Sequence, residues 1–140
     1  MQPEPAKILI VDDNLQVARI LQKSLIREGY DVEMATNGSR GVQKAEDFHP
    51  DLIIMDLMMP VMTGLEAAEH LRSHHNTKDI DIIFLTATQQ KSERAFAERI
   101  GIEKYLSKPF SVREVVTAVK DTLDGKKRVR PPEIDSSESL

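Results

Sequence analysis

Residues 51–64 read DLIIMDLMMPVMTG, and the other predicted elements are arranged around this stretch. Four consecutive apolar residues, at positions 52–55, stop at Asp56, so an ionisable carboxylate follows a run typical of a fully buried strand. Pro60 and Gly64 come soon afterwards and prevent that strand from continuing. The stretch therefore predicts that Asp56 lies at the mouth of a sheet.

Length and composition limit the class of protein. The chain has 140 residues, 40% hydrophobic and 30% charged, which suits one domain around one core. A net charge of −4 provides no basic field to attract nucleic acid or an anionic membrane. The absence of cysteine excludes disulfides and thiolate metal sites. With no secretory leader and no apolar run near the roughly 18 residues of a membrane span, we expect a cytoplasmic protein.

Short apolar runs alternate with segments of helical period along the chain. Strands are expected at residues 7–11, 31–35, 52–55, 82–85 and 104–107. Helices are expected after Asn14, after residues 36–38, at about 65–73, at about 91–100 and after Ser111. Five such alternations predict an α/β fold with a doubly wound parallel sheet.

The end of the last helix sets the predicted domain boundary. Its apolar repeat ends at Leu123, and Gly125 indicates a helix stop. Residues 126–140 follow no period and include two prolines. We therefore predict an extension at 1–6, one domain at 7–124 and a disordered tail or linker at 125–140.

Polar residues follow the carboxyl ends of four predicted strands. In an open α/β sheet, the ligand site lies outside these ends. With strand order 2-1-3-4-5 the four strands would be neighbours, and their polar side chains would surround Asp56. The residues concerned are Asp12, Asp13, Asp56, Thr86 and Lys108.

Three carboxylates in one cluster require a cation, because two of them about 4 Å apart repel by roughly 4 kcal/mol at an effective dielectric of about 20. A set of oxygen ligands favours Mg²⁺ over Zn²⁺, and Mg²⁺ in proteins commonly binds phosphate oxygens as well. The residues therefore predict phosphoryl transfer to Asp56 as the nucleophile. Mg²⁺ and Lys108 would neutralise the phosphoryl oxygens, and the Thr86 hydroxyl would donate a hydrogen bond to one of them.

Four segments, IVDDN, IIMDLMMPVMTG, FLTA and YLSKPF, resemble the receiver domain of two-component response regulators in order and spacing. The resemblance covers about residues 7–123 and implies a flavodoxin-like (βα)5 three-layer sandwich with sheet order 2-1-3-4-5. It implies a phosphorylation-activated switch that catalyses only its own phosphorylation and dephosphorylation at Asp56. The phosphoryl donor would be a phosphohistidine on a sensor histidine kinase or a histidine phosphotransfer protein.

The resemblance also implies a signalling surface. It would comprise the fourth helix, the fifth strand and the last helix, and would contact a downstream output protein or domain. A phosphorylation-linked homodimer is a further expectation. Direct nucleic-acid binding by the domain itself and contact with a membrane are not expected.

Roles for the metal ligands follow from the same resemblance. Asp13 and Asp56 would bind Mg²⁺ directly, Asp12 would act mainly through water, and the main-chain carbonyl of Met58 would complete the set. Met58 and Thr88 flank the approach of a hydrolytic water and would tune the rate of phosphoryl loss. Because the Met58 side chain orients water poorly, slow intrinsic dephosphorylation is expected.

Thr86 and Tyr105 would form a switch pair, in which the threonine turns toward the phosphoryl group and the tyrosine ring moves inward. Taken alone, Thr86 is an ordinary strand residue and Tyr105 is a half-buried strand aromatic. The resemblance also implies a cis peptide bond between Lys108 and Pro109.

Several interpretations stay open. The domain can be free-standing, or it can be the N-terminal receiver of a longer regulator with a DNA-binding or enzymatic output domain. A magnesium-dependent phosphatase or phosphotransferase acting on small molecules would share the carboxylates, but the chain has no DxD motif at the acceptor strand and no P-loop. His70 and His74, four residues apart on a helix, can bind a metal. No third ligand is evident in the sequence, so a solvated helix face is the preferred reading of this pair.

Overall fold

The structure is a computed structural model that describes residues 4–87, 91–102 and 104–129. Strands and helices alternate along these residues in the predicted order. The strands are β1 (Lys7–Val11), β2 (Asp31–Ala35), β3 (Leu52–Asp56), β4 (Asp81–Thr86) and β5 (Lys104–Ser107). The helices are α1 (Leu15–Arg27), α2 (Gly38–Phe48), α3 (Gly64–Arg72), α4 (Lys91–Arg99) and α5 (Val112–Val129).

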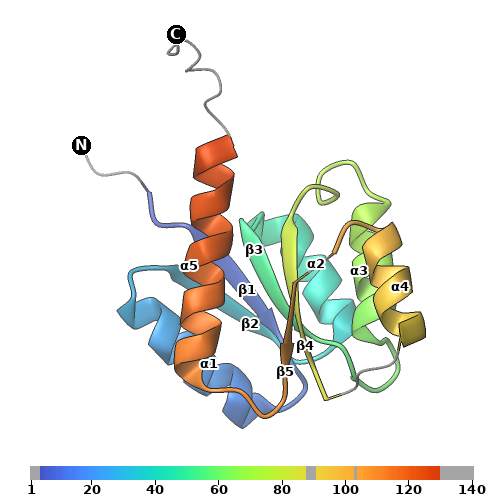
Figure 1. Ribbon diagram of the computed structural model, residues 1–140, viewed down its shortest axis with the longest axis horizontal. Coiled ribbons are helices and arrows are strands. Elements are labelled where there is room, and N and C mark those ends of the chain that lie inside the picture. Colours follow the sequence, from blue (N-terminus) through green and yellow to red (C-terminus); the bar gives the residue numbers. More distant parts are fainter. Residues whose placement is uncertain (1–3, 88–90, 103, 130–140) are drawn as a thin grey trace, which may run out of the picture.

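All strands in the described part of the chain belong to one parallel sheet with the predicted order β2-β1-β3-β4-β5 (Figure 1). The central strand β3 is buried along its whole length, which explains its unbroken apolar run. Its Ile54 pairs in register with Ile10 of β1 and Ile83 of β4. The carboxyl ends of these strands therefore lie at the same edge of the sheet.

Helices cover both faces of the sheet and complete the predicted three-layer sandwich. Helices α1 and α5 lie on one face, and α2, α3 and α4 lie on the other (Figure 1). Successive side chains of β3 alternate between the two cores: Leu52 and Ile54 pack with α1 and α5, whereas Ile53 and Met55 pack with the other three helices. Each face of the sheet is thus closed by its own hydrophobic core.

Side-chain caps define where the helices begin. The Asn14 side chain accepts hydrogen bonds from two backbone amides in the first turn of α1, which confirms the predicted cap. Ser111 and Glu114 bond reciprocally at the start of α5, in agreement with the prediction for Ser111. Thr63 and Glu66 form a similar capping box, so α3 begins one residue earlier than predicted.

The predicted end of the last helix at Gly125 is wrong. Helix α5 continues through Gly125 to Val129, so residues 125–129 of the predicted tail are helical and the rest lies outside the described residues. A glycine inside a helix costs only about 1 kcal/mol relative to alanine. A cost of this size does not by itself end a helix. Among the described residues, no helix has both the length and the apolar character needed to cross a membrane.

Candidate functional site

Parallel strands bring the predicted polar residues to one edge of the sheet. Asp56 ends β3 and is in register with Leu85 of β4, while Thr86 ends β4 opposite Ser107 of β5. The backbone amide of Lys108 donates to the Thr86 carbonyl over 2.8 Å, which ties the chain after β5 to the end of β4. The Lys108–Pro109 peptide bond is cis.

The acidic cluster comprises Asp12, Asp13 and Asp56, whose carboxylates each offer an oxygen within 4.8 Å of the others. Asp12 and Asp56 are 0% and 4% exposed, whereas Asp13 lies open to solvent. One oxygen of Asp12, Oδ1, accepts from the Asn14 backbone amide over 2.9 Å. The other, Oδ2, is buried and has no hydrogen-bond partner among the described residues. Burying a carboxylate oxygen without a hydrogen-bond donor costs free energy. A bound cation would therefore stabilise the cluster.

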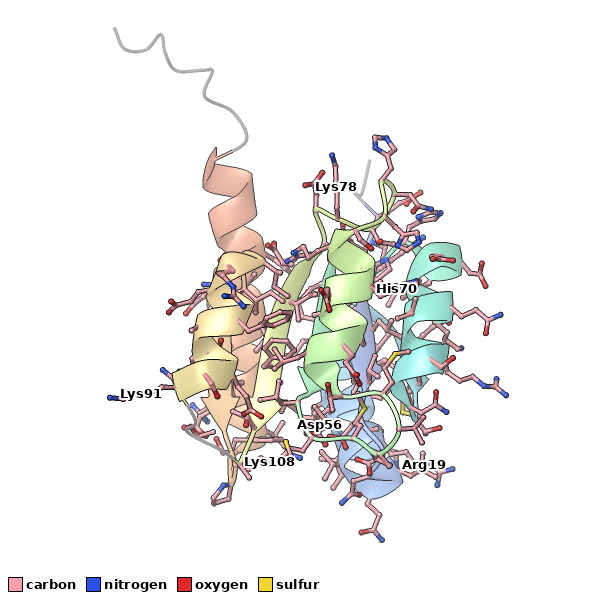
Figure 2. All side chains as sticks on the ribbon, turned by 90° about the vertical axis from the view of Figure 1, so that its right-hand side faces the viewer. Arg19, Asp56, His70, Lys78, Lys91 and Lys108 are labelled. Atoms are coloured by element: carbon pink, nitrogen blue, oxygen red, sulfur yellow. The ribbon has the colours of Figure 1, made fainter. Side chains whose placement is uncertain are left out.

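Both carboxylate oxygens of Asp56 have donors. The Lys108 ammonium donates to Oδ2 over 3.2 Å, and the Met58 backbone amide donates to Oδ1 over 3.1 Å. Figure 2 shows Lys108 and Asp56 near one another at the lower end of the molecule in that view. These two donors orient the Asp56 carboxylate at the edge of the sheet.

The pKa of Asp12 is raised from 3.8 to about 6, chiefly by burial. The negative charge of Asp56 contributes to this rise, whereas the Asn14 amide and the charge of Lys108 oppose it. Lys108 therefore offsets only part of the negative charge of the acidic cluster. A bound divalent cation would restore the ionised form of Asp12 at neutral pH.

The acidic cluster fits a metal ion. It offers carboxylate oxygens from Asp12, Asp13 and Asp56, and one of these oxygens is buried without a donor. The set consists of carboxylates and includes no imidazole or thiolate. Oxygen ligands of this kind suit a hard divalent cation.

The candidate switch residues lie on neighbouring strands. Thr86 is buried, and Tyr105 is half-buried opposite Phe84 in the register of β4 and β5. The Tyr105 ring lies 5.9 Å from the Phe84 ring, centroid to centroid. Its hydroxyl donates to the Arg94 carbonyl over 3.5 Å, and the Arg94 guanidinium lies 4.7 Å from its ring centroid. Tyr105 thus connects β5 to α4.

Met58 and Thr88 are the two candidate positions for tuning hydrolysis. Met58 is 55% exposed, and its backbone amide donates to Oδ1 of Asp56. Thr88 lies outside the described residues.

Sequence reasoning missed several contacts at this site. It gave no role to Arg94, because an arginine on a polar helix has no pattern that distinguishes a cation–π partner from a solvated side chain. It also missed the Met58 amide as a donor to Asp56, although Pro60 and Gly64 predicted the loop that turns this amide back. Gly64 lies so close to this loop that a Cβ atom would sit 2.5 Å from the Asp56 carbonyl oxygen.

Comparison with known families and proteins is consistent with this geometry. The response regulator receiver domain family matches residues 8–120. The chain is 39% identical over 117 residues to the alkaline phosphatase synthesis transcriptional regulatory protein PhoP of Bacillus subtilis, an alignment that covers 84% of this chain and 48% of PhoP. It is also 39% identical over 122 residues to the transcriptional regulatory protein ResD of Bacillus subtilis, covering 87% of this chain and 50% of ResD. The chain thus spans about half the length of these curated relatives.

Solved structures share the fold. The chemotaxis protein CheY4 of Vibrio cholerae superposes with a TM-score of 0.79 at 31% identity, covering 84% of this chain and 98% of CheY4. A CheY-like receiver domain protein of Methanospirillum hungatei gives a TM-score of 0.83 at 27% identity, covering 89% of this chain and 98% of that protein. From the family match and these likenesses, we conclude that the chain belongs to the response regulator receiver domain family.

Proposed function

We propose that Asp56 accepts a phosphoryl group from a phosphohistidine on a sensor histidine kinase or a histidine phosphotransfer protein. One observation carries this proposal: the Asp56 carboxylate lies between the Lys108 ammonium and the Met58 amide, beside two further carboxylates. An acceptor needs an oriented oxygen and nearby positive charge for the incoming phosphoryl oxygens. The site combines both.

In the proposed transfer, an Asp56 carboxylate oxygen attacks the phosphorus atom. A phosphorus–oxygen bond forms while the phosphorus–nitrogen bond of the donor breaks, and the departing imidazole nitrogen keeps the electron pair and takes up a proton. Lys108 balances part of the charge on the phosphoryl oxygens, and the Thr86 hydroxyl donates to one of them. The domain catalyses only its own phosphorylation and dephosphorylation.

Mg²⁺ is the cation we propose for the acidic cluster. Asp13 and Asp56 would hold it directly, Asp12 through water, and the Met58 main-chain carbonyl would complete the ligand set. When bound, Mg²⁺ supplies charge neutralisation for the phosphoryl oxygens. The buried, unpartnered oxygen of Asp12 and the all-oxygen character of the cluster support this assignment.

Signal output follows from contacts between the site and α4. A phosphoryl group near Thr86 adds strong acceptor oxygens beside β4, and Tyr105 on the next strand contacts Arg94 of α4. Ala97 is the buried residue of α4, so this helix is lightly anchored and can respond to a shift of Tyr105. We therefore propose that Thr86 and Tyr105 act as a switch pair and that α4, β5 and α5 form the output face.

A longer regulator is the second candidate, and the lengths of the relatives favour it. PhoP and ResD are named as transcriptional regulatory proteins, and this chain matches about half of each. In such a protein, the phosphorylated domain would act on an attached output domain or promote a homodimer. Sedimentation of the chain with and without beryllofluoride and Mg²⁺ tests the homodimer: a shift to a heavier species supports it, and an unchanged species contradicts it.

The central experiment is phosphoryl labelling of an Asp56→Asn variant. With a radiolabelled phosphodonor and Mg²⁺, wild-type chain should be labelled and Asp56→Asn should not, while circular dichroism shows an intact fold. Asp47→Asn is the matched control, because Asp47 is exposed on α2, away from the sheet edge. Persistent labelling of Asp56→Asn would identify another acceptor and contradict the proposal.

A further inference from the structure

A second group of metal-binding side chains lies on the face covered by α2 and α3. It consists of Glu46 from α2, His70 from α3 and His74, which lies two residues after the end of α3. Figure 2 shows Asp56, at the end of β3, near one end of α3, whereas His70 lies toward the opposite end of that helix. The group is therefore separate from the acidic cluster.

The three side chains converge. Each offers one ligand atom, a carboxylate oxygen of Glu46 or an imidazole nitrogen of His70 or His74, and these atoms lie within 4.8 Å of one another. The two imidazole rings are stacked, with centroids 4.3 Å apart and planes inclined by 28°. Within the described part of the chain, the Glu46 carboxylate has neither a hydrogen bond nor an ion pair. Its charge faces two imidazoles and is otherwise uncompensated by a direct partner.

A hydrogen bond determines which nitrogen of His74 is free. Its Nδ1 lies 2.7 Å from the carbonyl oxygen of His70. A carbonyl oxygen only accepts, so Nδ1 is the donor in this contact, and the Ser73 hydroxyl oxygen lies 3.2 Å from the same nitrogen. In this tautomer the neutral ring presents the lone pair of Nε2. Histidine ligands of metals usually have such a hydrogen bond on the other ring nitrogen, where it sets the tautomer and the ring orientation. His74 is thus arranged as a ligand before any metal binds.

From this arrangement we infer that Glu46, His70 and His74 form a binding site for Zn²⁺ on the α2–α3 surface. Two imidazoles and one carboxylate are a set that Zn²⁺ takes in proteins, with water in the fourth position. The ligand atoms of a tetrahedral zinc site are about 3.3 Å apart, given zinc–ligand bonds of about 2.0 Å. The three ligand atoms, which lie within 4.8 Å of one another, reach this spacing by rotation of their side chains. Rotation is feasible because His70 is exposed and Glu46 is half-buried.

The two sites select different cations. The acidic cluster offers only oxygen atoms, which suit a hard cation that keeps bound water. The Glu46 group offers two nitrogen atoms, and imidazole favours zinc and its transition-metal neighbours. A zinc ion bound at the second site would connect α2 to α3 and would stabilise the folded state, because the unfolded chain does not hold these ligands together.

Titration calorimetry of untagged full chain with ZnCl2, in millimolar Mg²⁺ to occupy the acidic cluster, tests the inference. One Zn²⁺ should bind per chain, and thermal melting should shift upward when Zn²⁺ is added. Glu46→Gln and His70→Ala should each weaken Zn²⁺ binding by about tenfold or more and remove the melting shift. His75→Ala is the matched control, because His75 is exposed one residue beyond the group and should leave both readouts unchanged.

Three outcomes would overturn the inference. The first is a wild-type chain that shows no saturable Zn²⁺ binding. The second is wild-type affinity in both Glu46→Gln and His70→Ala. The third is a loss of binding in His75→Ala equal to that in His70→Ala, which would place the ion on the neighbouring histidines instead.

Discussion

The Lys108 ammonium lies 3.2 Å from Oδ2 of Asp56, although 52 residues separate the two along the chain. Three features produce this contact: parallel pairing of β3, β4 and β5, the bond from the Lys108 amide to the Thr86 carbonyl, and the end of β3 at Asp56. The lysine side chain is 29% exposed, so solvent still reaches the ammonium. The pair therefore holds a positive charge at the proposed acceptor without burying it completely.

Lys108→Met removes this charge and keeps a side chain of similar length. Labelling of Asp56 by a phosphodonor with Mg²⁺ should slow by about 100-fold, because a donor to the developing charge is lost. The initial rate of labelling measures the effect. Lys104→Met, at an exposed position of β5, should label at the wild-type rate. Equal rates in the two variants would show that Lys108 takes no part in the transfer.

Met58→Asn should shorten the lifetime of the phosphorylated chain by several-fold. Met58 borders Asp56 and is largely exposed, and an amide at this position can orient a water molecule where a thioether cannot. The decay of phosphorylated protein after removal of the donor provides the measurement. Met58→Leu keeps an apolar side chain and should decay like wild type. An unchanged decay rate in Met58→Asn would contradict a role for position 58 in phosphoryl loss.

The contribution of Asp12 to the stability of the metal-free protein should decrease as the pH rises from about 4 to about 7. Burial raises the pKa of Asp12 in the folded state from 3.8 to about 6, so the folded state holds this proton more tightly than the unfolded state does. This contribution to stability is complete below pH 3.8 and is lost as the pH passes about 6. A shift of about two pKa units corresponds to roughly 3 kcal/mol in the free energy of unfolding.

Urea denaturation across this pH range, with a chelator present, measures the effect. Asp12→Asn should remove most of the decrease and should be more stable than wild type at pH 7, whereas Asp13→Asn should keep the decrease, because Asp13 is exposed. Mg²⁺ should restore stability to the wild type at pH 7. The same pH dependence in wild type and Asp12→Asn would exclude Asp12 as its source.

Two glycines should respond to alanine with opposite signs. A Cβ atom at Gly64 would lie 2.5 Å from the Asp56 carbonyl oxygen and 2.8 Å from the Leu57 Cα, and neither backbone atom can move without disturbing the loop after β3. Gly64→Ala should therefore destabilise the fold by about 2 kcal/mol. A Cβ atom at Gly125 would meet nothing within 4 Å, so Gly125→Ala should stabilise α5 by up to about 1 kcal/mol.

Urea denaturation of the two alanine variants gives both signs directly. A stable Gly64→Ala variant would mean that the loop after β3 tolerates displacement. A destabilised Gly125→Ala variant would contradict the helical backbone at Gly125.

The pattern of residues was sufficient to predict the strands and helices and to predict that the polar residues gather at one edge of the sheet. The run at 52–55 predicts a strand buried on both faces because only such a strand tolerates uninterrupted apolar residues, and β3 is buried throughout. Parallel strands place their carboxyl ends together, so Asp56 and Lys108 could be expected to meet before any contact was known. Both conclusions rest on local periodicity and on chain direction.

Other features depend on which side chains face one another across elements, and local sequence carries no signal for that. Asp12 and Asp13 are adjacent in sequence, but only the fold buries the first and exposes the second. Helix α5 passes through Gly125 because a penalty of about 1 kcal/mol does not decide a helix end. Glu46 joins His70 and His74 only because α2 packs beside α3, so the third zinc ligand came from tertiary structure. The sequence by itself determines the apolar period and the direction of the strands, whereas the packing of the cores determines the lateral contacts between helices.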